Sequence, residues 1–228
     1  MRVDILYRPA YSMAVVNLAP HEEIRVESGA LVSMTDGIQL QTTMEGGMLR
    51  SLSRAVMGNQ SFFVNVFQAP HFGGQINLAP TLPGDMMILQ IENESLLIQG
   101  GAFVACSPGI EVDTKWGGAR TFFASEGLIM LRVSGTGLAL LSSYGAIHPL
   151  ELPPGQRYTV DTGHLVAFTE GMGFNVRAIG GMRSTLFSGE GLVVDLTGPG
   201  RIYMQTRSED AFLSWLGPNM QHGPEHGG

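Results

Sequence analysis

One glycine-rich unit recurs three times along the chain, and this recurrence constrains the fold more than any other feature. The copies begin at Glu27, Gln99 and Asp161 and read ESGALVSMTDGIQLQT, QGGAFVACSPGIEVDT and DTGHLVAFTEGMGFNV. A glycine pair follows each copy, at Gly46-Gly47, Gly117-Gly118 and Gly180-Gly181. A unit of about 60 to 70 residues is too long for the common solenoid repeats and suits several strands per copy.

Apolar and polar residues alternate after the turn in each of the first two copies, as they do in half-buried strands. Ile38 and Leu40 occupy the apolar positions in the first copy, and Ile110 and Val112 occupy them in the second. The chain has 31 glycines and 12 prolines, which fall largely between such runs and are typical of tight turns. The sequence therefore predicts an all-β protein with three similar units around a pseudo-three-fold axis.

The repeat also predicts the domain organisation. We expect a single all-β domain over residues 1–217, because such domains reach about 250 residues. The repeat units are placed at about 11–80, 81–150 and 151–207.

Two segments depart from the strand pattern. A short helix is predicted over 208–217, where Ser208 can cap the first turn, two acidic residues follow, and Gly217-Pro218 would end it. One or two helical turns are also predicted within 48–58, where Leu49, Leu52 and Val56 have helical spacing. Residues 218–228 are mostly turn formers, so we expect a disordered tail that the fold does not need.

The composition limits the classes of partner. Charged residues make up only 14% of the chain, against about 25% in an average soluble domain, so a partner or second copy could cover much uncharged surface. The net charge is −7 and Lys115 is the only lysine, which disfavours nucleic acid and anionic membranes. A single cysteine, Cys106, fits a reducing compartment, and no apolar stretch approaches a membrane span, so we expect a cytoplasmic protein.

Two longer stretches resemble a known family. The run Tyr11-SMAVVNLAPHEEIRVESGALVSM and the run Gly198-PGRIYMQTRS are similar to the mitochondrial-biogenesis family called altered inheritance of mitochondria, protein twenty-four, which has many bacterial members. The resemblance implies a fold like that of the tryptophan RNA-binding attenuation protein, a double-stranded β-helix, with three such units per chain. It links the fungal member to organisation of the inner mitochondrial membrane, and it supplies no catalytic residues.

The residues capable of chemistry do not form a recognisable site. A metal centre in a double-stranded β-helix needs clustered histidines and a carboxylate, but His21, His71, His148 and His164 are scattered, so we expect no metal and no cofactor. Cys106 stands at a strand position taken by apolar residues in the other copies, which favours burial.

Two acidic residues recur at equivalent places. Glu126 and Glu190 each precede a glycine, which favours a turn-stabilising role over an acid site.

These observations predict a non-enzymatic interaction or scaffold protein that binds protein partners or itself. Phe212 and Trp215 are the candidate interaction residues, although their helix is predicted to cover the open end of the β-core rather than to form an interface. Two alternatives stay open. One is RNA binding, for which an arginine cluster of Arg177, Arg183, Arg201 and Arg207 is the basis, and the other is binding of a small ligand or lipid between units.

Overall fold

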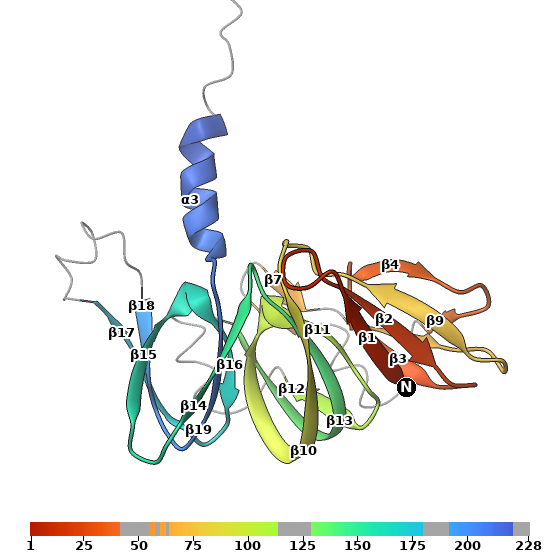
Figure 1. The fold of residues 1–228 in the computed structure, drawn as a ribbon, viewed down its shortest axis with the longest axis horizontal. Helices are drawn as coiled ribbons and strands as arrows, with labels where there is room; N and C mark the ends of the chain where they lie inside the picture. Colours follow the sequence, from red (N-terminus) through yellow and green to blue (C-terminus); the bar gives the residue numbers. More distant parts are fainter. Residues whose placement is uncertain (42–54, 58–59, 63, 114–128, 180–191, 221–228) are drawn as a thin grey trace, which may run out of the picture.

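A computed structural model describes residues 1–41, 55–57, 60–62, 64–113, 129–179 and 192–220. Strands dominate these residues and a single helix lies at their C-terminal end, which confirms the predicted all-β class (Figure 1). The glycine pairs of the repeat, Glu126 and Glu190 lie outside the described residues.

The strands fall into three sets that follow the repeat. Unit 1 contains β1 (Arg2–Leu6), β2 (Met13–Leu18), β3 (Glu23–Glu27), β4 (Leu31–Met34), β5 (Gln39–Gln41), β6 (Ala55–Met57), β7 (Gln60–Phe62), β8 (Val64–Gln68) and β9 (Gly74–Leu78). Unit 2 contains β10 (Met86–Gln99), the 3-10 turn η2 (Gly100–Ala102), β11 (Phe103–Cys106), β12 (Ile110–Asp113) and β13 (Met130–Ser142). Unit 3 contains β14 (Ile147–Leu152), β15 (Arg157–Asp161), η3 (Thr162–His164), β16 (Leu165–Thr169), β17 (Gly173–Ala178), β18 (Leu192–Thr197) and β19 (Gly200–Gln205).

The same antiparallel pairing occurs in each set. Unit 1 pairs β2 with β9 and β9 with β4, and it pairs β3 with β8 and β8 with β5. Unit 3 repeats this as β14-β19-β16 and β15-β18-β17. Unit 2 has the equivalent pairs in two long strands. β10 pairs with β13 along its length, and β13 pairs with β11 at one end and with β12 at the other. Each unit is therefore built on two sets of three paired strands, and in unit 2 the two sets share β10 and β13.

Neighbouring units are joined by one further strand pair. β11 of unit 2 pairs with β3 of unit 1, with Ala105 opposite Val26. β16 of unit 3 pairs with β10 of unit 2, with Ala167 opposite Ile98. These residues occupy the same places in the repeat, so both joins have the same register.

The units form a row rather than a closed ring, which corrects the predicted pseudo-three-fold axis (Figure 1). Closure would need a third join between β4 of unit 1 and β15 of unit 3, and the described strands include no such pair. Each join uses one strand from each neighbour, so among the described strands β4 and β15 at the two ends of the row have a neighbour on one side only.

The buried side chains form three clusters, one for each unit, and each join carries residues across. Val104 of β11 packs in the unit 1 cluster, and Val166 of β16 packs in the unit 2 cluster. Ile110 and Val112 are buried as their alternation predicts, but Leu40 is 48% exposed. Leu40 lies on β5, an edge strand with one neighbour in its sheet, and an edge position leaves one side open to water.

Positive backbone dihedrals explain two of the repeated glycines. Gly37 and Gly171 have φ of 87° and 92° in the turns that follow β4 and β16. A side chain there would crowd the backbone, so the turn favours glycine. Gly109, the corresponding glycine of the second copy, has no positive φ, so this turn geometry recurs in the first and third copies only.

The helix differs in detail from the sequence prediction, and so do residues 55–57, the only part of the segment 48–58 among the described residues. The helix α3 spans Glu209–Met220 and therefore continues past Gly217-Pro218, where the sequence predicted its end. Residues 218–220 are thus helical rather than part of a tail. Val56, predicted to lie in a helical turn, lies in β6, where it pairs with Ser61 across a two-strand ladder.

Candidate interaction surface

The helix α3 extends away from the sheets and approaches them at its base (Figure 1). It contacts η3 there, and the Phe212 ring meets the Tyr144 ring edge-on with centroids 6.0 Å apart. No residue of α3 belongs to any of the three buried clusters. The prediction that this helix covers the end of the β-core is therefore wrong, because the buried clusters of the described residues form without any residue of the helix.

Hydrogen bonds hold the base of α3 in place. The Ser208 hydroxyl accepts a hydrogen bond from the Ala211 amide at 3.4 Å, which is the predicted cap. The Arg207 amide donates to the Tyr144 carbonyl at 3.2 Å, and the Gln205 side chain donates to the Gly163 carbonyl at 2.9 Å. The helix thus begins at a fixed point on unit 3.

Large apolar side chains remain in water along α3. Leu213 is 52% exposed, Trp215 63% and Met220 71%, while Phe212 is 37% exposed and stacks on Trp215 with ring centroids 6.2 Å apart. With Tyr144 at the base, these residues form one surface, which we call the α3 surface. The two predicted interaction residues, Phe212 and Trp215, lie side by side at its centre.

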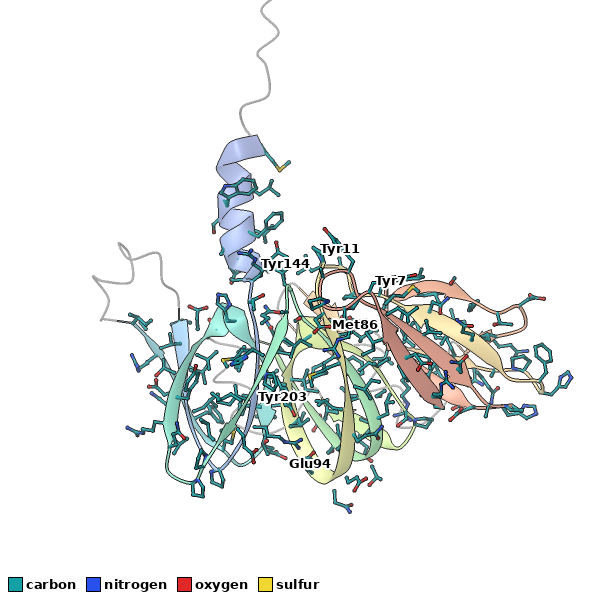
Figure 2. All side chains as sticks on the ribbon, in the orientation of Figure 1. Tyr7, Tyr11, Met86, Glu94, Tyr144 and Tyr203 are labelled. Carbon is teal, nitrogen blue, oxygen red and sulfur yellow. The ribbon has the colours of Figure 1, made fainter. Side chains whose placement is uncertain are left out.

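Two further tyrosines extend the exposed aromatic area on the same side of the molecule. Tyr7 and Tyr11 are 69% and 76% exposed in the turn between β1 and β2, and Figure 2 shows them on the side from which α3 rises. Neither tyrosine was predicted from the sequence. The sequence signal for them is that they flank the turn at Arg8-Pro9.

A buried carboxylate fixes the tyrosine turn to unit 2. Arg8 Nε and Nη2 donate to the two carboxylate oxygens of Asp85 at 2.7 and 2.9 Å, and Ser12 Oγ donates to Asp85 Oδ1 at 3.2 Å. Burial alone would raise the pKa of Asp85, but the hydrogen bonds from Arg8, the Met86 amide and Ser12 outweigh it and hold this pKa below its ordinary value. The turn is therefore held by an ionised carboxylate.

The residues considered for catalysis and metal binding are buried, contact the backbone or lie apart from one another. Cys106 is fully buried as predicted, and burial raises the pKa of its thiol to about 12. His164 Nδ1 lies 2.8 Å from the Gln205 carbonyl oxygen, which gives this histidine a structural role. Within the described part of the chain, no three His, Cys, Asp or Glu side chains are placed to hold a metal ion.

The arginines considered for RNA binding do not form a free cluster. Arg177 Nε lies 2.6 Å from Asp195 Oδ2, and Arg201 is paired with Glu94. Arg183 lies outside the described residues.

A shallow depression lies between unit 1 and unit 2. Its volume is about 580 Å³, and its lining consists of Val3, Asp4, Ile5, Leu6, Arg8, Met87 and Ile88. Its two charged side chains are already engaged, Asp4 with Arg2 and Arg8 with Asp85. A small-molecule site needs convergent polar groups, which this depression does not offer.

No helix among the described residues is both long enough and apolar enough to cross a membrane.

Comparison with known proteins gives consistent matches over most of the chain. The sequence model described as Mitochondrial biogenesis AIM24 matches residues 3–207. An uncharacterized protein of Streptococcus pyogenes serotype M6 is 25% identical over 225 residues, which cover 95% of this chain and 90% of that protein.

Two further matches extend the comparison to fungi and to a solved structure. Altered inheritance of mitochondria protein 24 of Verticillium alfalfae is 26% identical over 178 residues, 74% of this chain but only 43% of the fungal protein. A crystal structure of a Streptococcus pyogenes protein matches with a TM-score of 0.79 and 23% identity, over 96% of this chain and 99% of that one, and supports the fold.

Proposed function

The chain belongs to the mitochondrial biogenesis AIM24 family, and on this premise we propose that it is a non-enzymatic interaction protein that binds another protein through the α3 surface. The family description and the bacterial relative name no reaction, and the described residues that could support one are buried, paired or dispersed.

The observation that carries the proposal is the exposure of Trp215 and its neighbours on a helix with a fixed base. Aromatic side chains bury about 150 to 250 Å² each when covered, and tryptophan and tyrosine are the residues that most often dominate binding energy. The α3 residues contribute to no core cluster. Their exposed apolar side chains are therefore available to a partner, and this supports a role in binding.

The chemistry of the surface favours a protein with an apolar groove. Phe212, Leu213 and Trp215 lie within about one turn of the helix, and Met220 lies further along it. A helix of this kind inserts into a groove by its large side chains. The acidic balance of the chain, net −7 with one lysine, does not suit a phosphate backbone. The pairing of Arg177 and Arg201 with carboxylates gives the RNA alternative less support.

A single cysteine and the absence of a disulfide framework support a reducing compartment, so the proposal places the protein in the cytoplasm. The ligand alternative has the depression between units 1 and 2 as its basis, and the engaged Asp4 and Arg8 argue against it.

Trp215→Ala tests the proposal. A photoreactive amino acid placed at Leu213 should cross-link the chain to a discrete protein in cells, and W215A in the same chain should reduce that product by about 30-fold or more, the loss typical of a binding hot spot. The matched control Leu40→Ala, at another exposed apolar residue, should leave the product unchanged.

The melting temperature separates binding from folding. Trp215 is 63% exposed, so W215A should melt within about 2 °C of the unchanged chain. A large drop in melting temperature would assign the residue to the fold. Equal cross-linking by W215A and the unchanged chain would refute the α3 surface as a binding site.

A further inference from the structure

The strands at the two ends of the row are β4 and β15. They occupy the same positions in the repeat as the strands that pair at the internal joins. β4 of unit 1 corresponds to β11 and β16, and β15 of unit 3 corresponds to β3 and to the second half of β10. At the internal joins these strands pair with each other, β11 with β3 and β16 with β10. Figure 1 shows β4 and β15 toward opposite ends of the row.

The exposure of β4 shows what the missing pairing leaves uncovered. Val32 is 55% exposed, whereas the corresponding Val104 and Val166 are 1% and 0% exposed. Both buried valines reach the cluster of the preceding unit, Val104 that of unit 1 and Val166 that of unit 2. The unit 3 cluster receives no such valine among the described residues.

The exposure of β15 is complementary. Tyr158 is 38% exposed, whereas the corresponding Ile24 and Leu96 are 0% and 1% exposed. Exposed sheet edges are usually blocked by lysine, proline or inward-pointing charge. β4 reads LVSM and has none of these, and β15 carries charge only at its first and last residues, Arg157 and Asp161.

From these observations we propose that two copies of the chain associate head to tail, with β4 of one copy pairing antiparallel to β15 of the next in the register of the internal joins. Ala105 opposite Val26 and Cys106 opposite Arg25 in the first join correspond to Ser33 opposite Val160 and Met34 opposite Thr159 between copies. Val32 of one copy then packs in the unit 3 cluster of the other. The four-stranded sheet of unit 1 and the β15-β18-β17 sheet become one continuous sheet across the contact.

Such a contact uses two different surfaces, so it is heterologous, and each added copy exposes the same pair of ends again. The assembly grows with concentration until it closes into a ring or continues as a filament. The proposal goes beyond binding through the α3 surface, because β4 and β15 contain none of its residues.

Disulfide trapping tests the register directly. Met34→Cys protein mixed with Thr159→Cys protein should form a disulfide-linked pair of chains under mild oxidation, because directly opposite residues bring their Cβ atoms within reach. The chain's own Cys106 is fully buried and should not compete. Leu40→Cys mixed with T159C is the matched control, since Leu40 is similarly exposed on an edge strand outside the proposed contact, and its yield should be lower by about tenfold or more.

Light scattering coupled to size exclusion tests the association itself. The unchanged chain should exceed 24.5 kDa and grow in mass with concentration, and Val32→Lys should return the mass to 24.5 kDa with the melting temperature kept, because Val32 is exposed in a single copy. W215A should still assemble, so loss of α3 binding and loss of head-to-tail contact are separable. A constant mass of 24.5 kDa, equal trapping of L40C and M34C, or disulfide pairing of M34C with itself alone would overturn the proposal.

Discussion

Unit 1 and unit 2 contain equivalent strands, β4 and β11, which differ in whether a second strand pairs along their outer edge. β11 in unit 2 lies between β13 and β3 and is buried along its whole length, whereas β4 in unit 1 pairs only with β9 and is exposed along its whole length. The two strands have similar sequences, FVAC and LVSM. In a row of repeats, the burial of a strand is therefore set by its neighbour rather than by its own residues.

The largest expected difference is at the first residue of these strands. Phe103→Ala should lower the free energy of unfolding by about 3 to 5 kcal/mol, because Phe103 is fully buried and its removal leaves a cavity. Leu31→Ala should cost less than about 1 kcal/mol, because Leu31 is already 40% exposed. Urea unfolding at low protein concentration measures both, and equal losses would contradict the contrast between the units.

The connection between the two units should contribute a smaller amount. Asp85→Asn should cost about 1 to 3 kcal/mol at pH 7, because it removes the charge of a buried carboxylate that accepts hydrogen bonds from Arg8 and Ser12. Asp4→Asn, which affects the exposed pair with Arg2, should change stability by less than about 0.5 kcal/mol.

The pH dependence gives an independent check on Asp85. Its pKa is lowered in the folded chain, so its contribution is present above the unfolded value of about 3.9 and is lost as the pH falls through the folded pKa. The stabilities of D85N and the unchanged chain should therefore converge in acid. A gap that stays constant from pH 7 to pH 3 would show that the carboxylate charge is not responsible.

The smallest expected effect compares Glu27 with Gln99, which stands at its place in unit 2. Burial raises the pKa of Glu27 to about 7, so the folded chain holds a proton there more tightly than the unfolded chain does. Its contribution to stability is greatest below about pH 4.3 and is lost as the pH rises to about 7. Glu27→Gln should therefore be more stable than the unchanged chain by about 1 to 2 kcal/mol at pH 8, allowing for partial exposure, and nearly equal to it at pH 4.

Chemical unfolding at the two pH values measures this difference. Gln99→Glu is the reciprocal variant and should lose stability at pH 8. An E27Q variant that is less stable than the unchanged chain at pH 8 would show that the Glu27 charge is favourable.

The sequence was sufficient to predict the strand content and the places of the turns, and insufficient to predict which surfaces remain open. Glycines such as Gly37 and Gly171 record a local backbone requirement, and the alternation around Ile110 records one buried side of a strand. Both are properties of a few neighbouring residues. The pseudo-three-fold axis was predicted wrongly because the arrangement of whole units depends on contacts between residues far apart in the sequence, such as Ala105 and Val26.

The interaction surface shows the same limit. Phe212 and Trp215 were recognised as large apolar residues on a short helix, but composition alone assigns such residues to the core as readily as to an interface. Their exposure follows from the direction in which α3 leaves β19, and Tyr7 and Tyr11 reach the same side through a turn held by Asp85. No local sequence pattern specifies the direction of the helix or the position of the tyrosine turn.

The identical register of the two internal joins has a consequence for how chains of this kind can change in length. In a chain that lost its middle copy, or gained a fourth, the row of units would still have a strand like β4 at one end and a strand like β15 at the other. This follows because every join pairs one strand of each type. Gene duplication or deletion of whole copies would therefore alter the span of the protein while leaving the chemistry of its ends unchanged. Length and end recognition can evolve separately.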